Sequence, residues 1–249
     1  MRRWLPWALA GVSLALTAAA AVLLLLSRST PPPTGTFGFR GFAILLALAF
    51  TAVGPLIAAR RPGNPIGWLL LAAGLASAIQ AFTAEYAIYA VLAHPRSLPA
   101  GRYVAWVQAW VWMVPVGILG GLVFPLFPNG RLLSRRWRVV PWLAAVGMVL
   151  GIVGTAVAPG PLQAFGAVVN PFGVQGSNPL SGFEGGGLPF IAAILAGAVS
   201  LFVRFRRADG LEREQVKWLA YSGAVVAVLL VPAGLTASAS STSVWSKAM

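Results

Sequence analysis

Long apolar runs, separated by short basic or polar segments, dominate the pattern of this chain. Runs of about 18 or more apolar residues are typical of membrane-spanning helices. The pattern predicts seven spans, at Leu5–Leu26, Gly41–Ala59, Ile66–Leu92, Tyr103–Phe124, Val139–Ala158, Leu188–Val203 and Trp218–Leu235. Backbone groups in lipid must be bonded within the protein, so the expected fold is an all-α, multi-pass transmembrane helix bundle.

The first predicted span has a rival interpretation as a cleaved signal peptide, since both begin with basic residues followed by an apolar stretch. A signal peptide should end at small residues before a polar mature start. Here Ala18–Ala21 is followed by Val22 and four leucines, which favours an uncleaved span. We therefore expect residues 1–237 to form one sensor-like bundle and residues 238–249 to be a short, polar, disordered tail.

The composition excludes two broad classes of protein. Hydrophobic residues make up 58% of the chain and charged residues 9%, whereas soluble domains carry about 25% charged residues. A water-soluble globule and a disordered chain are both excluded. The chain has no cysteine, and so no disulfide framework, thiolate nucleophile or Cys metal site.

Eighteen Lys and Arg against five Asp and Glu give a net charge of +13, and the placement of the basic residues predicts the topology. With a cytoplasmic N-terminus the inner side holds thirteen of them, namely Arg2, Arg3, Arg60, Arg61, Arg131, Arg135, Arg136, Arg138, Arg204, Arg206, Arg207, Arg213 and Lys217. The outer side holds Arg28, Arg40, Arg96, Arg102 and Lys247. The charge therefore indicates topology and contact with anionic lipid head groups at the inner face, not nucleic-acid binding. Seven spans place the C-terminus outside.

Small residues in the spans form two GxxxG pairs, Gly117 with Gly121 and Gly147 with Gly151. Such pairs let helices approach closely, either across a dimer face or, as we favour, within one bundle. We also expect the sixth span to extend to Phe205, with the side chains of its arginines reaching the lipid interface.

One acidic residue, Glu85, lies deep in a span, where charge is costly and often functional. It is either a structural carboxylate paired with Arg102 or Arg40, or part of a ligand or proton site. Trp106 and Trp110 belong either to an interfacial tryptophan belt or to an aromatic pocket open to the outer side. The candidate receiving region consists of Glu85, Tyr86, Tyr89, Trp106, Gln108 and Trp110.

Catalytic patterns are scarce, and we predict that the chain is not an enzyme. The single histidine, His94, lies in an outer loop before a proline, where solvent exposure is expected. The sequence has no GxxxxGK[ST], HExxH or GxSxG motif. We expect neither a metal nor a cofactor. In the inner loops, Asn129–Gly130 predicts a tight turn and Ser134 is expected to cap a short basic segment.

Five segments, taken in order, resemble the membrane-embedded N-terminal sensor region of bacterial, chiefly actinobacterial, two-component sensor histidine kinases. They are RRPGNPIGW at Arg60–Trp68, HPRSLP at His94–Pro99, LFPNGRLLSRRWR at Leu126–Arg138, NPFG at Asn170–Gly173 and RFRRADGLEREQVKWLAY at Arg204–Tyr221. The resemblance covers about residues 1–235. Asn129 stands where that family usually has Asp, and Leu133 where it usually has Pro.

That family continues with a further span and with kinase domains, whose phospho-accepting histidine and ATP-binding motifs this sequence lacks. The resemblance therefore implies an integral sensor-like protein of the bacterial plasma membrane without its own kinase domain, either a truncated product or a stand-alone paralogue. Output would pass through the inner basic loops to a partner kinase or within a homodimer. The alternative is a small multi-pass permease or channel-like protein, and a membrane enzyme is the least favoured class.

Overall fold

The computed structural model describes residues 4–33, 39–175, 180, 183, 187–210, 213–219 and 221. Within these ranges the regular structure is helical, with one isolated bridge between Pro161 and Val169. Six helical stretches of the described part are long and apolar enough to cross a membrane, at Leu5–Leu26, Phe42–Arg60, Pro65–Ala93, Gly101–Leu126, Arg135–Ala156 and Gly187–Arg207. The all-α bundle and its first six spans are thereby confirmed. The seventh predicted span, Trp218–Leu235, lies mostly outside the described residues, as does the predicted tail at 238–249.

Three of the six stretches are built from several helical segments. The first two are single helices, α1 (Leu5–Leu26) and α2 (Phe42–Arg60). The third is α3 (Pro65–Ala87) followed by a π-helical segment, η1 (Ile88–Ala93). The fourth consists of α4 (Gly101–Val111), α5 (Met113–Gly117), a second π-helical segment, η2 (Ile118–Val123), and α6 (Phe124–Leu126). The last two stretches are η3 (Arg135–Arg138) with α7 (Val139–Ala156), and α8 (Gly187–Arg207).

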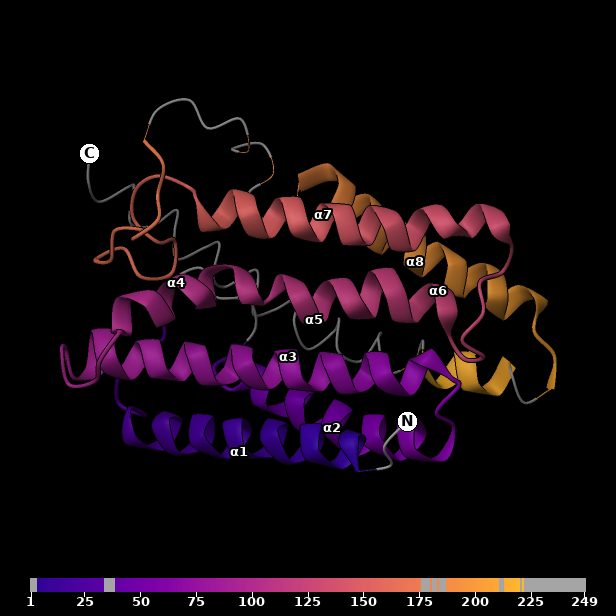
Figure 1. The fold of residues 1–249 in the computed structure, drawn as a ribbon, viewed down its shortest axis with the longest axis horizontal. Helices are drawn as coiled ribbons and strands as arrows, with labels where there is room; N and C mark the ends of the chain where they lie inside the picture. Colours follow the sequence, from indigo (N-terminus) through magenta and orange to yellow (C-terminus); the bar gives the residue numbers. More distant parts are fainter. Residues whose placement is uncertain are drawn as a thin grey trace.

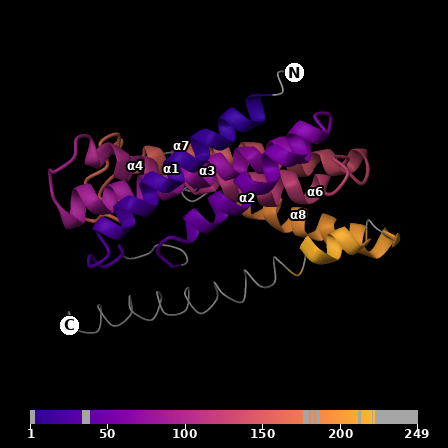
Figure 2. The ribbon, with the colours of Figure 1, turned by 90° about the horizontal axis from the view of Figure 1, so that it is seen from below.

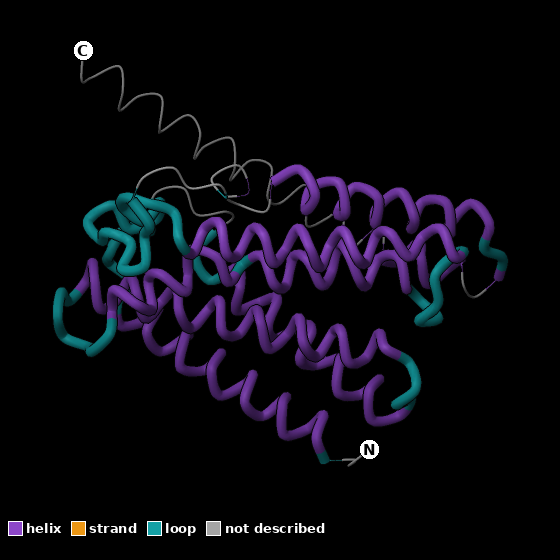
Figure 3. Tube along the Cα trace, turned by 45° about the horizontal axis from the view of Figure 1, so that its top comes forward, coloured by secondary structure: helices purple, strands orange, loops and turns teal. Residues whose placement is uncertain are grey.

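The helices run along the long axis of the molecule and alternate in direction (Figure 1). The start of α1, the α2–α3 loop, the α6–α7 loop and the end of α8 consequently lie at one end of the bundle, which we call the basic end. The other connections lie at the opposite end, which we call the outer end (Figure 3). The central helix is α3, which packs against α1, α2, α4 and α5, and α1 lies across it when seen from below (Figure 2).

Glycines allow α3 to lie close against α2 over its whole first half. A Cβ on Gly67 would lie 2.5 Å from the backbone nitrogen of Ala58, and one on Gly54 would lie 2.6 Å from that of Leu71. A polar contact joins α1 to the same layer, since the hydroxyls of Ser13 and Thr51 are 2.6 Å apart. Small residues at crossing points are the usual basis of helix association in lipid.

Three of the four GxxxG glycines, Gly117, Gly121 and Gly147, pack within the bundle, as we favoured. A Cβ on Gly117 would lie 3.0 Å from Phe190 and one on Gly147 would lie 2.6 Å from the Phe190 backbone nitrogen. A Cβ on Gly121 would overlap the side chain of Ala144. These three glycines therefore bring α5, η2, α7 and α8 together. The outward faces instead carry large apolar side chains such as Leu188, which is 82% exposed, as lipid contact requires.

Candidate functional site

A buried ion pair lies at the outer end, between Arg40, two residues before α2, and Glu85 in the last turn of α3. Arg40 Nη2 lies 2.6 Å from Glu85 Oε2, and Arg40 Nε donates to Oε2 at 3.0 Å and to Oε1 at 3.2 Å. The side chains are 15% and 4% exposed respectively. Gly41, which lies between Arg40 and the start of α2, has a φ of +90°, a left-handed conformation that glycine adopts readily.

The remaining donors of Arg40 hold the end of α1. Nη1 donates to the carbonyl oxygens of Ser27 at 2.9 Å and Thr30 at 3.0 Å, and Nη2 donates to Ser27 Oγ at 2.6 Å. Ser27 is the residue directly after α1, where carbonyl groups have no partner within the helix. Arg40 thus joins α1, α2 and α3 at one point, with all three guanidinium nitrogens bonded. We call Arg40, Glu85 and Ser27 the outer clamp.

Of the two arginines expected as ion-pair partners of Glu85, the structure selects one. The carboxylate pairs with Arg40, whereas Arg102 is exposed and donates to the Tyr103 hydroxyl at 2.6 Å. Glu85 lies three residues before η1, in the stretch where α3 widens into a π-helix. Short π segments inside α-helices occur frequently at functional sites.

The other candidate residues of the receiving region hold loops in place around the clamp. Tyr86 donates its hydroxyl hydrogen to the Pro99 carbonyl at 2.7 Å. Tyr89 packs on the ring of His94 with centroids 4.7 Å apart, and His94 is exposed as predicted. These contacts fix the α3–α4 connection beside the last turns of α3.

The tryptophans form a packed cluster at the outer end of α4. Trp106 Nε1 donates to the Ala156 carbonyl at 2.8 Å, and the Trp106 ring lies 4.7 Å from that of Phe172 and 5.5 Å from that of Trp110. Trp110 Nε1 is buried, and within the described residues it has no hydrogen-bond partner. Gln108 likewise makes no hydrogen bond to any described residue. No hydrogen bond, ion pair or ring contact in this part of the structure joins the Trp106 cluster to Glu85, so the six candidate residues fall into two groups.

The connection between α7 and α8 contains a folded cap that sequence reasoning missed. Asn170 at its centre is only 7% exposed. Its Nδ2 donates hydrogen bonds to the carbonyl oxygens of Ala156 at 3.1 Å and Ala158 at 2.7 Å. Its Oδ1 accepts a hydrogen bond from the backbone nitrogen of Phe172 at 3.0 Å. Leu162 and Phe165 of the same cap pack in one apolar cluster with residues of α3, η1 and α4. The NPFG segment is the signal that could have indicated this fold, because Asn side chains bond to nearby backbone groups in turns.

At the basic end, the α2–α3 and α6–α7 loops pack against each other. Asn64 caps α3 by accepting a hydrogen bond from Ile66 N at 3.0 Å, with Pro65 as the first helical residue. Gly130 has a φ of +71°, as the predicted Asn129–Gly130 turn requires, and a Cβ there would lie 2.6 Å from Pro65 Cδ and 2.8 Å from Asn64 Oδ1. The two turns consequently fit together only because position 130 is glycine.

Arg204 joins α8 to the same loop, which corrects one prediction. We expected it to reach the lipid interface, but it is only 7% exposed, and its Nη2 donates to the carbonyls of Arg131 at 2.6 Å and Pro125 at 3.3 Å. Carbonyls at the end of α6 lack helical partners, and a guanidinium supplies several donors at once. Asn64, Gly130 and Arg204 therefore link three inner segments; we call them the inner latch.

The other described basic residues of this end lie at the surface, whereas Arg2 and Arg3 lie outside the described residues. Exposed members are Arg60, Arg61, Arg131, Arg135, Arg136, Arg138, Arg206, Arg207 and Arg213. Lys217 is partly exposed and lies 3.5 Å from Glu214 Oε2, as the i,i+3 spacing predicts. Ser134 precedes the short basic helix as expected, but its side chain makes no capping hydrogen bond, which corrects the predicted cap. Within the described residues no three potential metal ligands lie together.

The six long apolar helical stretches define a multi-pass α-helical membrane protein. Comparison with protein-family models, with curated proteins and with solved structures gives no significant match. The resemblance of its loops to sensor regions therefore stays a prediction.

Proposed function

We propose that this protein is a sensing module of the bacterial plasma membrane that passes a change at its outer end to its basic loops, without catalysis of its own. The observation that carries the proposal is that one central helix, α3, holds a residue of the outer clamp at one end and a residue of the inner latch at the other. From Asn64 to Glu85 the helix rises about 32 Å at 1.5 Å per residue, close to the thickness of a bilayer core.

A helix of this kind suits signalling because its two ends cannot shift independently. The glycine contacts with α2 leave little space for bending near the basic end. The clamp is a set of charge-assisted hydrogen bonds, which are roughly twice as strong as neutral ones. A stimulus that acts on Arg40 or Glu85 would therefore displace α3 against α1 and α2.

The output would leave through the inner latch. Arg204 connects the α6–α7 loop to the end of α8, which leads into the basic segment at 204–217. A partner histidine kinase, or a second copy of the chain, would receive the change there. The resemblance of this segment and of both latch loops to kinase sensor regions supports that assignment.

The absence of native cysteine makes the proposal directly testable by double spin labelling. Cysteines at exposed Arg61 and Arg207 would report the distance between the α2–α3 loop and the end of α8 in protein reconstituted in lipid. We expect Glu85→Gln to shift this distance by about 1–2 Å, the usual scale of helix shifts in signalling. Arg102→Gln, which removes an exposed charge at the same end, should leave it unchanged.

The same distance in wild type and in Glu85→Gln, with both proteins folded, would contradict the coupling of the two ends. Incorporation of phosphate from ATP by the purified chain would contradict its non-enzymatic role. Solute flux into proteoliposomes that contain the chain would instead support the permease alternative. In cells, Glu85→Gln should impair the response to whichever stimulus is found.

A further inference from the structure

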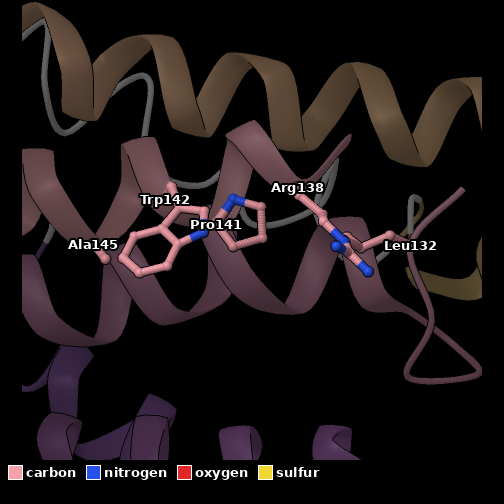
Figure 4. A pocket seen from close by; sticks show the side chains of 5 residues that line it. All are labelled: Leu132, Arg138, Pro141, Trp142 and Ala145. Carbon is pink, nitrogen blue, oxygen red and sulfur yellow. The ribbon is translucent and has the colours of Figure 1, made fainter. Parts of the chain in front are cut away.

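A shallow groove lies on the surface of the bundle at the start of α7. It has a volume of about 310 Å³ and is lined by Leu132, Arg138, Pro141, Trp142 and Ala145 (Figure 4). The last four follow the spacing i, i+3, i+4 and i+7, so they share one helix face. Leu132 comes from the preceding loop and lies beside the Arg138 end of this row (Figure 4).

The surface beside the Arg138 end of the groove is strongly cationic, although the lining of the groove itself is almost wholly apolar. The Arg138 side chain is exposed and makes no hydrogen bond or ion pair with any described residue. Arg131, Arg135 and Arg136 lie in the same short segment and are also exposed, and the sequence from 131 to 138 contains no acidic residue. The positive end of the α7 dipole lies here too, since α7 begins at Val139. An anion at this point would meet uncompensated positive charge.

Beyond Arg138 the lining is apolar. Trp142 is 71% exposed, and Figure 4 shows its ring beside Pro141, between Ala145 and Arg138. Indole rings of this kind settle at the head-group level of a bilayer, with one edge polar and the rest apolar. Arg138 and Ala145 are about 10 Å apart along the helix at 1.5 Å per residue. The cationic surface at Arg138 and the apolar lining at Ala145 are therefore separated by about the distance between a phosphate and the first part of an acyl chain.

We propose that this groove binds one anionic glycerophospholipid from the leaflet that faces the basic loops. Its phosphate would contact the Arg138 guanidinium, and the start of one acyl chain would lie along Pro141, Trp142 and Ala145. Basic pockets beside membrane helices are known to hold anionic head groups. The assignment goes beyond a basic face near lipid, because it names one site with one occupant. Inorganic phosphate has no apolar part that could contact the apolar lining.

Native mass spectrometry of the full chain in detergent tests the site. The measured quantity is the dissociation constant of the first bound lipid during titration with phosphatidylglycerol or with phosphatidylcholine. Arg138→Gln should weaken phosphatidylglycerol binding roughly fivefold, as one basic residue near an anionic lipid contributes about that factor. Arg61→Gln removes the same charge from an exposed position at the basic end but outside the groove, and should change the constant less than about twofold.

A second pair of variants tests the apolar part. Ala145→Phe fills the groove and should weaken the binding of both lipids, whereas Val146→Phe, on the neighbouring lipid-facing surface, should weaken neither. Inorganic phosphate should not displace the bound lipid. Equal losses in Arg138→Gln and Arg61→Gln would overturn the site in favour of diffuse attraction, and displacement by phosphate would overturn the lipid as its occupant. If Ala145→Phe does not fold, as judged by its helical circular dichroism, the arginine pair decides alone.

Discussion

Replacing Glu85 with glutamine should destabilise the bundle by far more than the loss of a surface charge. The substitution keeps the size of the side chain but leaves the Arg40 guanidinium, only 15% exposed, without its counter-charge. Removing one partner of a buried ion pair typically costs about 3–5 kcal/mol, because the other charge stays buried and uncompensated.

The structure places Glu85→Gln at the lower end of that range. The amide oxygen still accepts one hydrogen bond, and Arg40 Nη1 stays bonded to the carbonyls of Ser27 and Thr30. What is lost is the shortest contact, 2.6 Å from Nη2 to Oε2, together with the charge itself. We therefore expect a loss of about 3 kcal/mol in the free energy of unfolding.

The assay is unfolding of the purified protein from mixed micelles by a denaturing detergent, followed by helical circular dichroism. A double-mutant cycle with Arg40→Met separates the pair from its surroundings, and the coupling energy should be about 2 kcal/mol, within the range for contacting groups. Arg102→Gln is the control, since its guanidinium is exposed, and should change stability by no more than about 0.5 kcal/mol. A coupling energy near zero, or a Glu85→Gln effect as small as the control, would refute the reasoning.

Two further substitutions test the loops. Gly130→Ala should lower the free energy of unfolding by about 2 kcal/mol in the same assay, because a Cβ there meets Pro65 and a positive φ is unfavourable for alanine. Gly210→Ala is the control, since Gly210 also has a positive φ but has open space around it. Its loss of stability should be about 1 kcal/mol smaller. Asn170→Ala removes three hydrogen bonds of the outer cap and should cost about 1–3 kcal/mol while speeding amide hydrogen exchange across residues 157–175. The exposed Gln163→Ala in the same cap should change neither quantity, and equal effects in the two cap variants would mean that Asn170 does not hold it.

The pattern of apolar runs was sufficient to predict where the described helices lie in the sequence. Lipid demands long, fully bonded apolar segments, so span positions depend on local composition alone. For α1 the predicted and observed bounds coincide, and for α7 they differ by two residues at one end. The glycine pairs were also informative, because close helix contact needs small residues wherever it occurs.

Partners distant in sequence were not predictable in the same way. Glu85 had two plausible partners, and only the packing of α1, α2 and α3 selects Arg40, which is 45 residues away. Arg204 was misassigned because a basic residue at a helix end normally reaches the interface. The unbonded carbonyls of Pro125 and Arg131, which it satisfies, are a property of how a distant loop folds and leave no local signal.

Membrane topology is the claim on which the functional account depends most directly, and single-cysteine labelling measures it. In intact bacterial cells, a cysteine at exposed Ser134 of the basic end should be protected from an impermeant maleimide, and should react only after permeabilisation. A cysteine at exposed Gln163 of the outer cap should react in intact cells. The opposite pattern, with position 134 labelled and position 163 protected, would contradict the account.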